Sequence, residues 1–181
     1  MIFFAYKGVK KVNLNPDFEV GQKLDSLNNV FVFYNGGVDN VVQRNTEDGY
    51  NLGLEYQCVE FVKRYYYEHY HHKMPDSYGH AISFYDASVP DGALNTQRNL
   101  NQYSNPSKMY PQEGDLLVME GSLFNRYGHV AIISKVTDNQ IEIIQQNPGP
   151  YAPSRESFEL EQTAENTWKI NNDRVLGWLR K

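Results

Sequence analysis

Apolar and charged residues recur with a helical period in the middle of the first half of the chain. One face, with a repeat of about 3.6 residues, carries Cys58, Phe61, Val62, Tyr65, Tyr66 and His69. The opposite face carries Glu60, Lys63, Arg64 and Glu68. Gly53 precedes this pattern and Pro75 follows it, and both residue types favour helix boundaries. The pattern predicts an amphipathic helix from about Gln57 to about His72.

After Gly114 the pattern changes to short apolar runs that are typical of β-strands. We predict three strands, at residues 115–119, 129–136 and 140–147, followed by one or two terminal strands at 168–170 and 175–179. The polar stretch at 137–140 predicts a tight turn, so the second and third strands should form an antiparallel hairpin.

The remaining segments are less regular. Apolar runs at 2–4 and 30–33 predict short strands or extended segments, and residues 77–85 a short second helix. The polar stretches at 38–51 and 95–112 are predicted to be loops. A helical half followed by an antiparallel sheet is the α+β pattern, and 181 residues fit one domain, residues 1–181.

Composition narrows the class of protein. The 40% hydrophobic content is typical of globular chains, and the net charge of −5 argues against a nucleic-acid partner. No apolar run approaches the roughly 18 residues of a membrane span. The apolar start is short and followed by lysines, unlike a signal peptide. We expect synthesis in the cytoplasm, with any delivery outside the cell by a route not visible in the sequence, and leave protein partners open.

The only cysteine, Cys58, falls in the first turn of the predicted helix. The unpaired N–H groups and positive dipole end of a helix stabilise a thiolate, and can lower the pKa of a thiol well below about 8.5. This position favours a nucleophile. A free cysteine is also often a small buried hydrophobe, and the helix alone leaves both interpretations open.

A nucleophilic thiolate needs a base, and His129 is the best candidate because it opens a predicted strand directly after Gly128. His69, His71 and His72 lie about 17–20 Å from the start of the helix, at about 1.5 Å per residue. Their spacing matches no common zinc pattern. We therefore predict no metal site and no cofactor.

The base in turn needs an acceptor that orients its second ring nitrogen. If Thr137 pairs with Ile141 in the hairpin, Gln145 and Asn147 lie on the face of the histidine, whereas a slip of one residue presents Gln146 instead. In both registers the side chain that would orient the imidazole of His129 is an amide.

An oxyanion would need the backbone N–H of Cys58 and a donor such as Gln57 or Tyr56.

Five motifs occur in an order that resembles the CHAP family of cysteine, histidine-dependent amidohydrolases and peptidases. They lie at residues 57–61, 114–117, 128–133, 145–147 and 176–178, and the resemblance covers about residues 29–181. Within the family, the chain most resembles the amidase domains of the glutathionylspermidine synthetase/amidase and trypanothione synthetase type. The resemblance implies a papain-like (NlpC/P60-like) fold, with N-terminal helices packed on an antiparallel β-sheet.

The resemblance also implies a cysteine-dependent amidase that works through an acyl-thioester. Cys58 would be the nucleophile and His129 the base, and the third position falls on Gln145 and Asn147. This chain has Gln145 where the family usually has Glu.

Lys63 and Arg64 are the candidate substrate-binding side chains, and Lys63 replaces an Arg that is typical of the glutathionylspermidine type. The expected partner is a peptide or a peptide conjugate. We favour the peptide part of peptidoglycan slightly over a glutathionylspermidine-like conjugate. The alternative of another class is a binding module that keeps the fold and has lost turnover.

Overall fold

A computed structural model describes residues 12–122 and 125–181, which form two compact units. The helix unit contains the described residues up to Lys73 together with Gln145–Ser154. The sheet unit contains Met74–Ile144 and Arg155–Lys181. The assignment of the chain to one domain stays a prediction.

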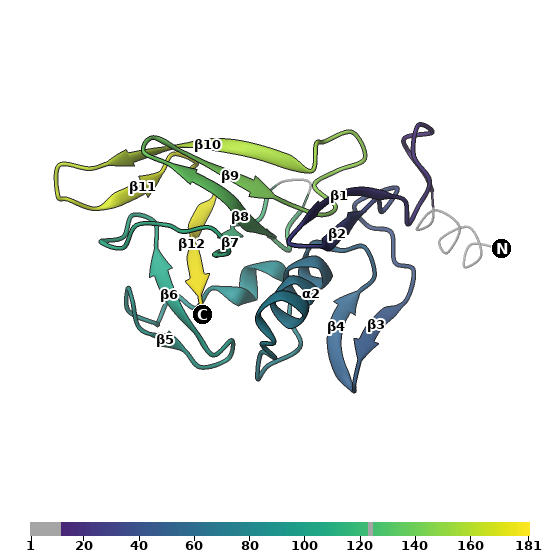
Figure 1. The fold of residues 1–181 in the computed structure, drawn as a ribbon, viewed down its shortest axis with the longest axis horizontal. Coiled ribbons are helices and arrows are strands. Elements are labelled where there is room, and N and C mark those ends of the chain that lie inside the picture. Colours follow the sequence, from purple (N-terminus) through teal and green to yellow (C-terminus); the bar gives the residue numbers. More distant parts are fainter. Residues whose placement is uncertain (1–11, 123–124) are drawn as a thin grey trace. The chain divides into compact units, whose positions relative to one another are not determined.

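The helix unit consists of two β-hairpins and an α-helix (Figure 1). Strand β1 (Lys23–Leu27) pairs antiparallel with β2 (Val30–Phe33), and β3 (Arg44–Glu47) pairs antiparallel with β4 (Tyr50–Leu54). The helix α2 (Cys58–Tyr70) contacts β2 and β4. The prediction of this helix is confirmed, with Gln57 at its N-cap and His71 at its C-cap in the left-handed region.

One expectation about the helix unit is wrong. Residues 38–51 are not a loop, because they include β3 and the start of β4. Asp48 and Gly49 both have positive φ, as a two-residue hairpin turn of this kind requires. The charged face of α2 is largely buried: Glu60 and Lys63 are 2% and 1% exposed, whereas Glu68 is exposed.

The sheet unit is built on one eight-stranded sheet in the order β11-β10-β9-β8-β7-β12-β6-β5, with all neighbours antiparallel. In chain order its elements are the 3-10 helix η1 (Ala81–Phe84), β5 (Leu94–Asn95), β6 (Leu100–Ser104), β7 (Leu116–Met119), β8 (His129–Thr137), β9 (Gln140–Ile144), β10 (Arg155–Gln162), β11 (Trp168–Ile170) and β12 (Val175–Arg180). Figure 1 shows β8, β9 and β10 as long neighbouring strands. The core of the unit includes Leu117, Ala131, Ile133, Ile143 and Trp178, all fully buried.

The structure confirms the β8–β9 hairpin. Of the two registers left open by the sequence, the turn has the one-residue slip, since Thr137 pairs with Gln140 rather than Ile141, and the register shifts again between Ile133 and Lys135. The strand β9 is also shorter than predicted, since it ends at Ile144. Residues 145–147 therefore do not lie on a strand, and the argument that placed two of them on one strand face is wrong.

Three further segments of the sheet unit differ from expectation. Residues 95–112 are not a continuous loop, because they contain β6, which pairs with β12 and β5. The predicted helix at 77–85 is reduced to η1. The strand β10, in which only Phe158 and Leu160 are buried, was not predicted from the sequence.

The expected fold class holds at the level of mixed α and β structure with a large antiparallel sheet. The expectation of several N-terminal helices does not: before Lys73, the described residues contain the two hairpins and α2. The apolar run at 2–4 lies outside the described residues. Within those residues, no helix combines the length and the apolar character needed to span a membrane.

Candidate functional site

Cys58 is the first residue of α2, as the sequence predicts. Its side chain is 8% exposed, and the preceding Gln57 is extended, with φ −86° and ψ 156°. One residue earlier, Tyr56 has a φ of 63°, in the left-handed region that non-glycine residues seldom adopt. The chain thus turns sharply into the helix just before the thiol. Free N–H groups and the positive dipole end at the start of a helix favour a thiolate at such a position.

The segment that follows β9 is bonded to the start of α2. The Asn147 Nδ2 donates to Gln57 Oε1 at 2.8 Å and to the Val38 carbonyl at 2.9 Å. The Gln146 Nε2 donates to the Gln57 carbonyl at 3.0 Å and to Glu60 Oε2 at 2.9 Å. Three of these four bonds join residues 146 and 147 to the N-terminal turn of the helix that carries the cysteine.

The side chain of Gln57 is fully engaged in this arrangement. Its Nε2 donates to the carbonyls of Val38 and Asn40, at 3.0 and 2.7 Å, while its oxygen accepts from Asn147. An amide nitrogen has two hydrogens, so both are used. The predicted role of Gln57 as an oxyanion donor would require one of these bonds to break, and it stays a prediction.

Tyr56, the other candidate donor, packs against Phe33 with ring centroids 5.5 Å apart. Burial raises the pKa of its hydroxyl, and the negative charges of Glu55 and Glu60 raise it further. The phenol therefore keeps its proton over the neutral range and can donate a hydrogen bond.

The two candidate substrate-binding side chains lie in the interior of the helix unit. Arg64 is 7% exposed, and its Nε donates to Glu60 Oε1 at 2.6 Å, while an Nη donates to the Phe31 carbonyl at 2.7 Å. Lys63 donates to the Asn51 carbonyl, and its ammonium lies 4.6 Å from the centre of the Tyr50 ring. These contacts hold the unit together. The substrate-binding role of Lys63 and Arg64 stays a prediction.

Gln145 stands between the sheet unit and the bonded residues 146 and 147 in the sequence. Its backbone N–H donates to the Ser154 carbonyl at 2.9 Å, and its Nε2 donates to the Pro153 carbonyl at 3.3 Å. Two residues later, Asn147 has a φ of 58°. The chain leaves the extended conformation here, which explains why a strand pattern misplaced these residues.

In the sheet unit, His129 is the first residue of β8 and is buried. It pairs with Met119 on β7. The preceding Gly128 has a φ of 78°, and a Cβ atom there would lie 2.7 Å from the Met119 carbonyl oxygen, so this position requires glycine. The strand start predicted for His129 is confirmed. Its action on Cys58, and its orientation by Gln145 or Asn147, stay predictions.

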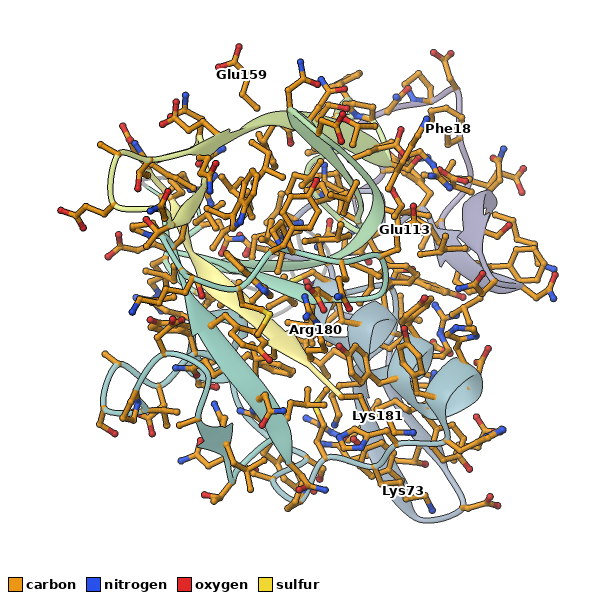
Figure 2. The ribbon with its side chains drawn as sticks, turned by 60° about the vertical axis from the view of Figure 1, so that its left-hand side comes forward. Phe18, Lys73, Glu113, Glu159, Arg180 and Lys181 are labelled. Atoms are coloured by element: carbon orange, nitrogen blue, oxygen red, sulfur yellow. The ribbon has the colours of Figure 1, made fainter. Side chains whose placement is uncertain are left out.

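Two of the sequence motifs have structural roles in the sheet unit. The buried Asp115 accepts two hydrogen bonds of 2.7 Å from Arg180, which Figure 2 labels on β12. Burial raises the pKa of the Asp115 carboxyl, although its bonds with Arg180 act in the opposite direction. At Gly177, a Cβ atom would lie 2.0 Å from the Tyr103 carbonyl oxygen. Neither contact was predicted from the sequence motifs.

The histidines at the end of α2 form no recognisable metal centre. His71 is the C-cap residue, and the His72 ring packs edge-on against Tyr66 at 5.8 Å. Within the described ranges, no group of three or more His, Cys, Asp or Glu residues is arranged to hold a metal ion.

Comparisons with known proteins give a consistent family match. The family model described as the CHAP domain matches residues 46–147, which include both Cys58 and His129. The bifunctional glutathionylspermidine synthetase/amidase of Escherichia coli (strain K12) is 32% identical over an alignment of 155 residues that covers 78% of this chain and 24% of that protein. The trypanothione synthetase of Crithidia fasciculata is 30% identical over 133 residues, 72% of this chain and 20% of that protein.

The chain thus spans about a quarter or less of the length of these curated relatives, 24% and 20%. Among solved structures, the crystal structure of Ly7917 with the hydrolyzing product of MDP aligns with 41% of this chain and 29% of that chain. The sequence identity is 25% and the TM-score 0.30.

Proposed function

Because the chain belongs to the CHAP domain family, we propose that it is an amidohydrolase or peptidase whose nucleophile is Cys58. The observation that carries this proposal is the place of Cys58 as the first residue of α2, within the matched segment. The positive end of the helix dipole stabilises a thiolate there. The bonds from Gln146 and Asn147 to Gln57 keep the start of the helix in place.

In the proposed reaction His129 takes the proton of the Cys58 thiol, and the thiolate sulfur attacks the carbonyl carbon of an amide. The C–N bond breaks as His129 gives its proton to the leaving amine, and the acyl group remains as a thioester. His129 then deprotonates a water that attacks this thioester. The C–S bond breaks, a carboxylic acid leaves and the thiol is restored. A papain-like arrangement of helix and sheet is part of this proposal.

For the third position we propose Gln145, with Asn147 in a different role. The Gln145 Nε2 donates to the Pro153 carbonyl, so its oxygen is the side-chain atom suited to accept an imidazole N–H. The Asn147 side chain donates to Gln57 and Val38, which supports a role in holding the start of α2. A neutral amide in the third position is compatible with thiol catalysis, because papain-like proteases use Asn there.

As substrate we propose the peptide part of peptidoglycan. The contacts of Lys63 support this choice over a glutathionylspermidine conjugate, since its ammonium donates to a backbone carbonyl inside the helix unit rather than standing ready for a substrate carboxylate. The names of the curated relatives support the second candidate, a glutathionylspermidine-type amidase.

The deciding experiment incubates the wild-type chain and Cys58→Ala separately with purified peptidoglycan and with glutathionylspermidine. We expect new amino groups from peptidoglycan with the wild type alone, detected by mass spectrometry of the soluble products. Cleavage of glutathionylspermidine alone would establish the second candidate. If the wild type cleaves neither substrate, both assignments are wrong.

Variants at the third position test its role. Gln145→Ala should lower kcat because the imidazole loses its acceptor, whereas Gln145→Glu should preserve or raise kcat because a carboxylate stabilises the imidazolium. The measurement is the initial rate on the cleaved substrate as a function of pH. Equal rates for the three proteins would move the orienting role to Asn147.

An inactive binding module is the alternative of another class, and the neutral Gln145 motivates it. The pH dependence of iodoacetamide labelling of Cys58 separates the two. For an enzyme we expect thiolate reactivity that persists down to about pH 6, whereas labelling that rises only near pH 8.5 is the behaviour of an ordinary thiol and would favour the binding module.

A further inference from the structure

The sheet unit contains a buried guanidinium that the proposed chemistry does not use. Arg98 lies in the turn between β5 and β6 and is 1% exposed. One of its terminal nitrogens donates to the Asp76 carbonyl at 2.6 Å and to the Tyr78 carbonyl at 3.3 Å. The other donates to the Ser83 carbonyl at 3.0 Å and to the Ser83 Oγ at 3.3 Å. Arg98 therefore holds both ends of the segment 76–83, which includes most of η1.

These contacts suit an arginine better than a lysine. A guanidinium donates in fixed directions from several nitrogens, whereas an ammonium is a single donor centre. The guanidinium carbon of Arg98 also lies 4.0 Å from the centre of the Phe84 ring, at the end of η1, which adds a cation–π contact. The Arg98 backbone N–H donates to the Asn95 carbonyl at 3.2 Å, so the turn from which the side chain extends is itself held in place.

The segment 76–83 is in direct contact with the residues that precede His129. The Ile82 N–H donates to the Tyr127 carbonyl at 2.9 Å. At Gly128, a Cβ atom would lie 3.0 Å from the Ile82 nitrogen, so the two backbones pass close to each other. Because Tyr127 and Gly128 immediately precede His129, which opens β8, these contacts fix the place where β8 begins.

We propose that Arg98 is a positioning residue for His129, which it reaches through the segment 76–83 and the start of β8. The stacking of His80 on Tyr127, with ring centroids 4.4 Å apart, is a second link between the same two parts of the chain. The proposal rests on the proposed function, since it is the task of His129 as a base that demands accurate placement. A displacement of about 1 Å can lower a catalysed rate roughly a hundredfold.

The test compares Arg98→Lys with a matched control, Arg180→Lys, in the full chain. Both changes keep the positive charge and replace a fork of donors by a single ammonium. Arg180, which Figure 2 labels, bonds to Asp115 and to the Tyr110 carbonyl instead. On the cleaved substrate we expect Arg98→Lys to lower kcat roughly tenfold to a hundredfold with KM unchanged, and Arg180→Lys to keep both values. An unchanged kcat in Arg98→Lys, or an equal decrease in both variants, overturns the proposal.

A second measurement follows His129 itself and needs no substrate. In a chain with isotopically labelled histidine, the ring resonances of His129 are identified in NMR spectra by their loss in His129→Gln. We expect these resonances to shift or broaden in Arg98→Lys, because a displaced imidazole meets different neighbours, and to keep their wild-type positions in Arg180→Lys. Unchanged resonances in Arg98→Lys overturn the proposal.

A third variant disturbs the same segment without changing Arg98. Gly79 has a φ of 117°, and a Cβ atom there would collide with the Ser83 Oγ, so Gly79→Ala should displace Ser83 and also lower kcat. Because both changes act through the segment 76–83, their effects on kcat should not add in the double variant. Fully additive effects overturn the proposed route. Circular dichroism checks the folding of each variant, and Gly79→Ala carries the test alone if Arg98→Lys does not fold.

The outcomes separate this proposal from the proposed function. If the wild type cleaves no substrate but the His129 resonances move in Arg98→Lys and not in Arg180→Lys, the placement of His129 by Arg98 is supported and the enzyme is contradicted. If the wild type cleaves a substrate and Arg98→Lys changes neither kcat nor the His129 resonances, the enzyme is supported and the role of Arg98 is contradicted.

Discussion

The helix unit and the sheet unit differ in what fills their interiors. The hydrophobic core cluster of the sheet unit is aliphatic and aromatic, with fully buried Ile143 among its members, and the buried Asp115 of that unit lies outside this cluster. The interior of the helix unit contains charge: Glu60 and Arg64 form an ion pair, and Gln146, which is fully buried, donates to the same carboxylate.

The two units therefore hold their parts of the candidate site by different kinds of interaction. Apolar packing is non-directional and tolerates small adjustments, whereas hydrogen bonds to a buried carboxylate are satisfied in few geometries. Glu60 joins Asn45, Arg64 and Gln146 at bond lengths of 2.9, 2.6 and 2.9 Å. We infer that the helix unit fixes the start of α2 through this polar cluster.

Removing the centre of the cluster should have the largest effect. Glu60→Ala leaves the Arg64 guanidinium buried without the carboxylate that neutralises its charge. Breaking a buried ion pair in this way costs about 3–5 kcal/mol. We expect a decrease of that size in the free energy of unfolding, measured by urea titration with circular dichroism.

The comparison variant lies in the sheet unit. Ile143→Val removes one methylene from a fully buried position and should cost about 0.5–1.5 kcal/mol. If Glu60→Ala costs no more than Ile143→Val, the polar cluster is not what holds the helix unit, and the contrast between the two interiors has no energetic meaning.

Breaking only the link between the segment after β9 and the helix should have a smaller effect. Gln146→Met keeps the length of the side chain but loses its bonds to the Gln57 carbonyl, Glu60 and the Phe33 N–H. The partners left unsatisfied predict a loss of about 1–3 kcal/mol. Iodoacetamide labelling of Cys58 should also change its rate, because the start of α2 is no longer fixed.

The control for this variant is Gln112→Met, the same replacement at an exposed residue of the sheet unit. It should alter neither stability nor labelling. A change of stability in Gln146→Met with an unaltered labelling rate would limit Gln146 to a structural role and contradict its effect on the helix start.

The parts of the fold with strong local signals were predictable. The helix α2 has a clear apolar period, and the β8–β9 hairpin joins neighbouring apolar strands through a short turn. The missed strands lack such signals: β3 (Arg44–Glu47) contains no apolar residue, and β10 has two buried ones. These strands are stabilised by backbone hydrogen bonds to a partner strand, and the pattern of their side chains does not predict this pairing.

The candidate site shows the same limit. The position of Cys58 could be predicted because a helix start has local signals, and so could the strand start at His129. The burial of Glu60 could not be predicted, because Gln146, which donates a hydrogen bond to the buried carboxylate, is 86 residues away in the sequence. Locally, Glu60 belongs to the charged face of an amphipathic helix. The turn at Asn147 escaped prediction because bonds to Val38 and Gln57 stabilise it.

The smallest expected effect concerns a carboxylate near the surface of the sheet unit, in contrast to the buried Glu60. Hydrogen bonds from Ser134 and then Arg155 lower the pKa of Glu142 from its ordinary 4.5, and its side chain is 31% exposed. A carboxyl whose pKa is lower in the folded state stabilises the protein above its unfolded pKa, and this contribution is lost as the pH falls through the folded value. Glu142→Gln should therefore cost less than about 1 kcal/mol near neutral pH, and the difference from wild type should disappear in acid. Urea titrations of both proteins at neutral and at acid pH measure this difference in the free energy of unfolding.

The Ser134→Ala background is the control. The difference caused by Glu142→Gln should shrink there, because the hydrogen bond from Ser134 is the largest cause of the lowered pKa. A difference that stays constant from neutral to acid pH would show that packing, not charge, is responsible.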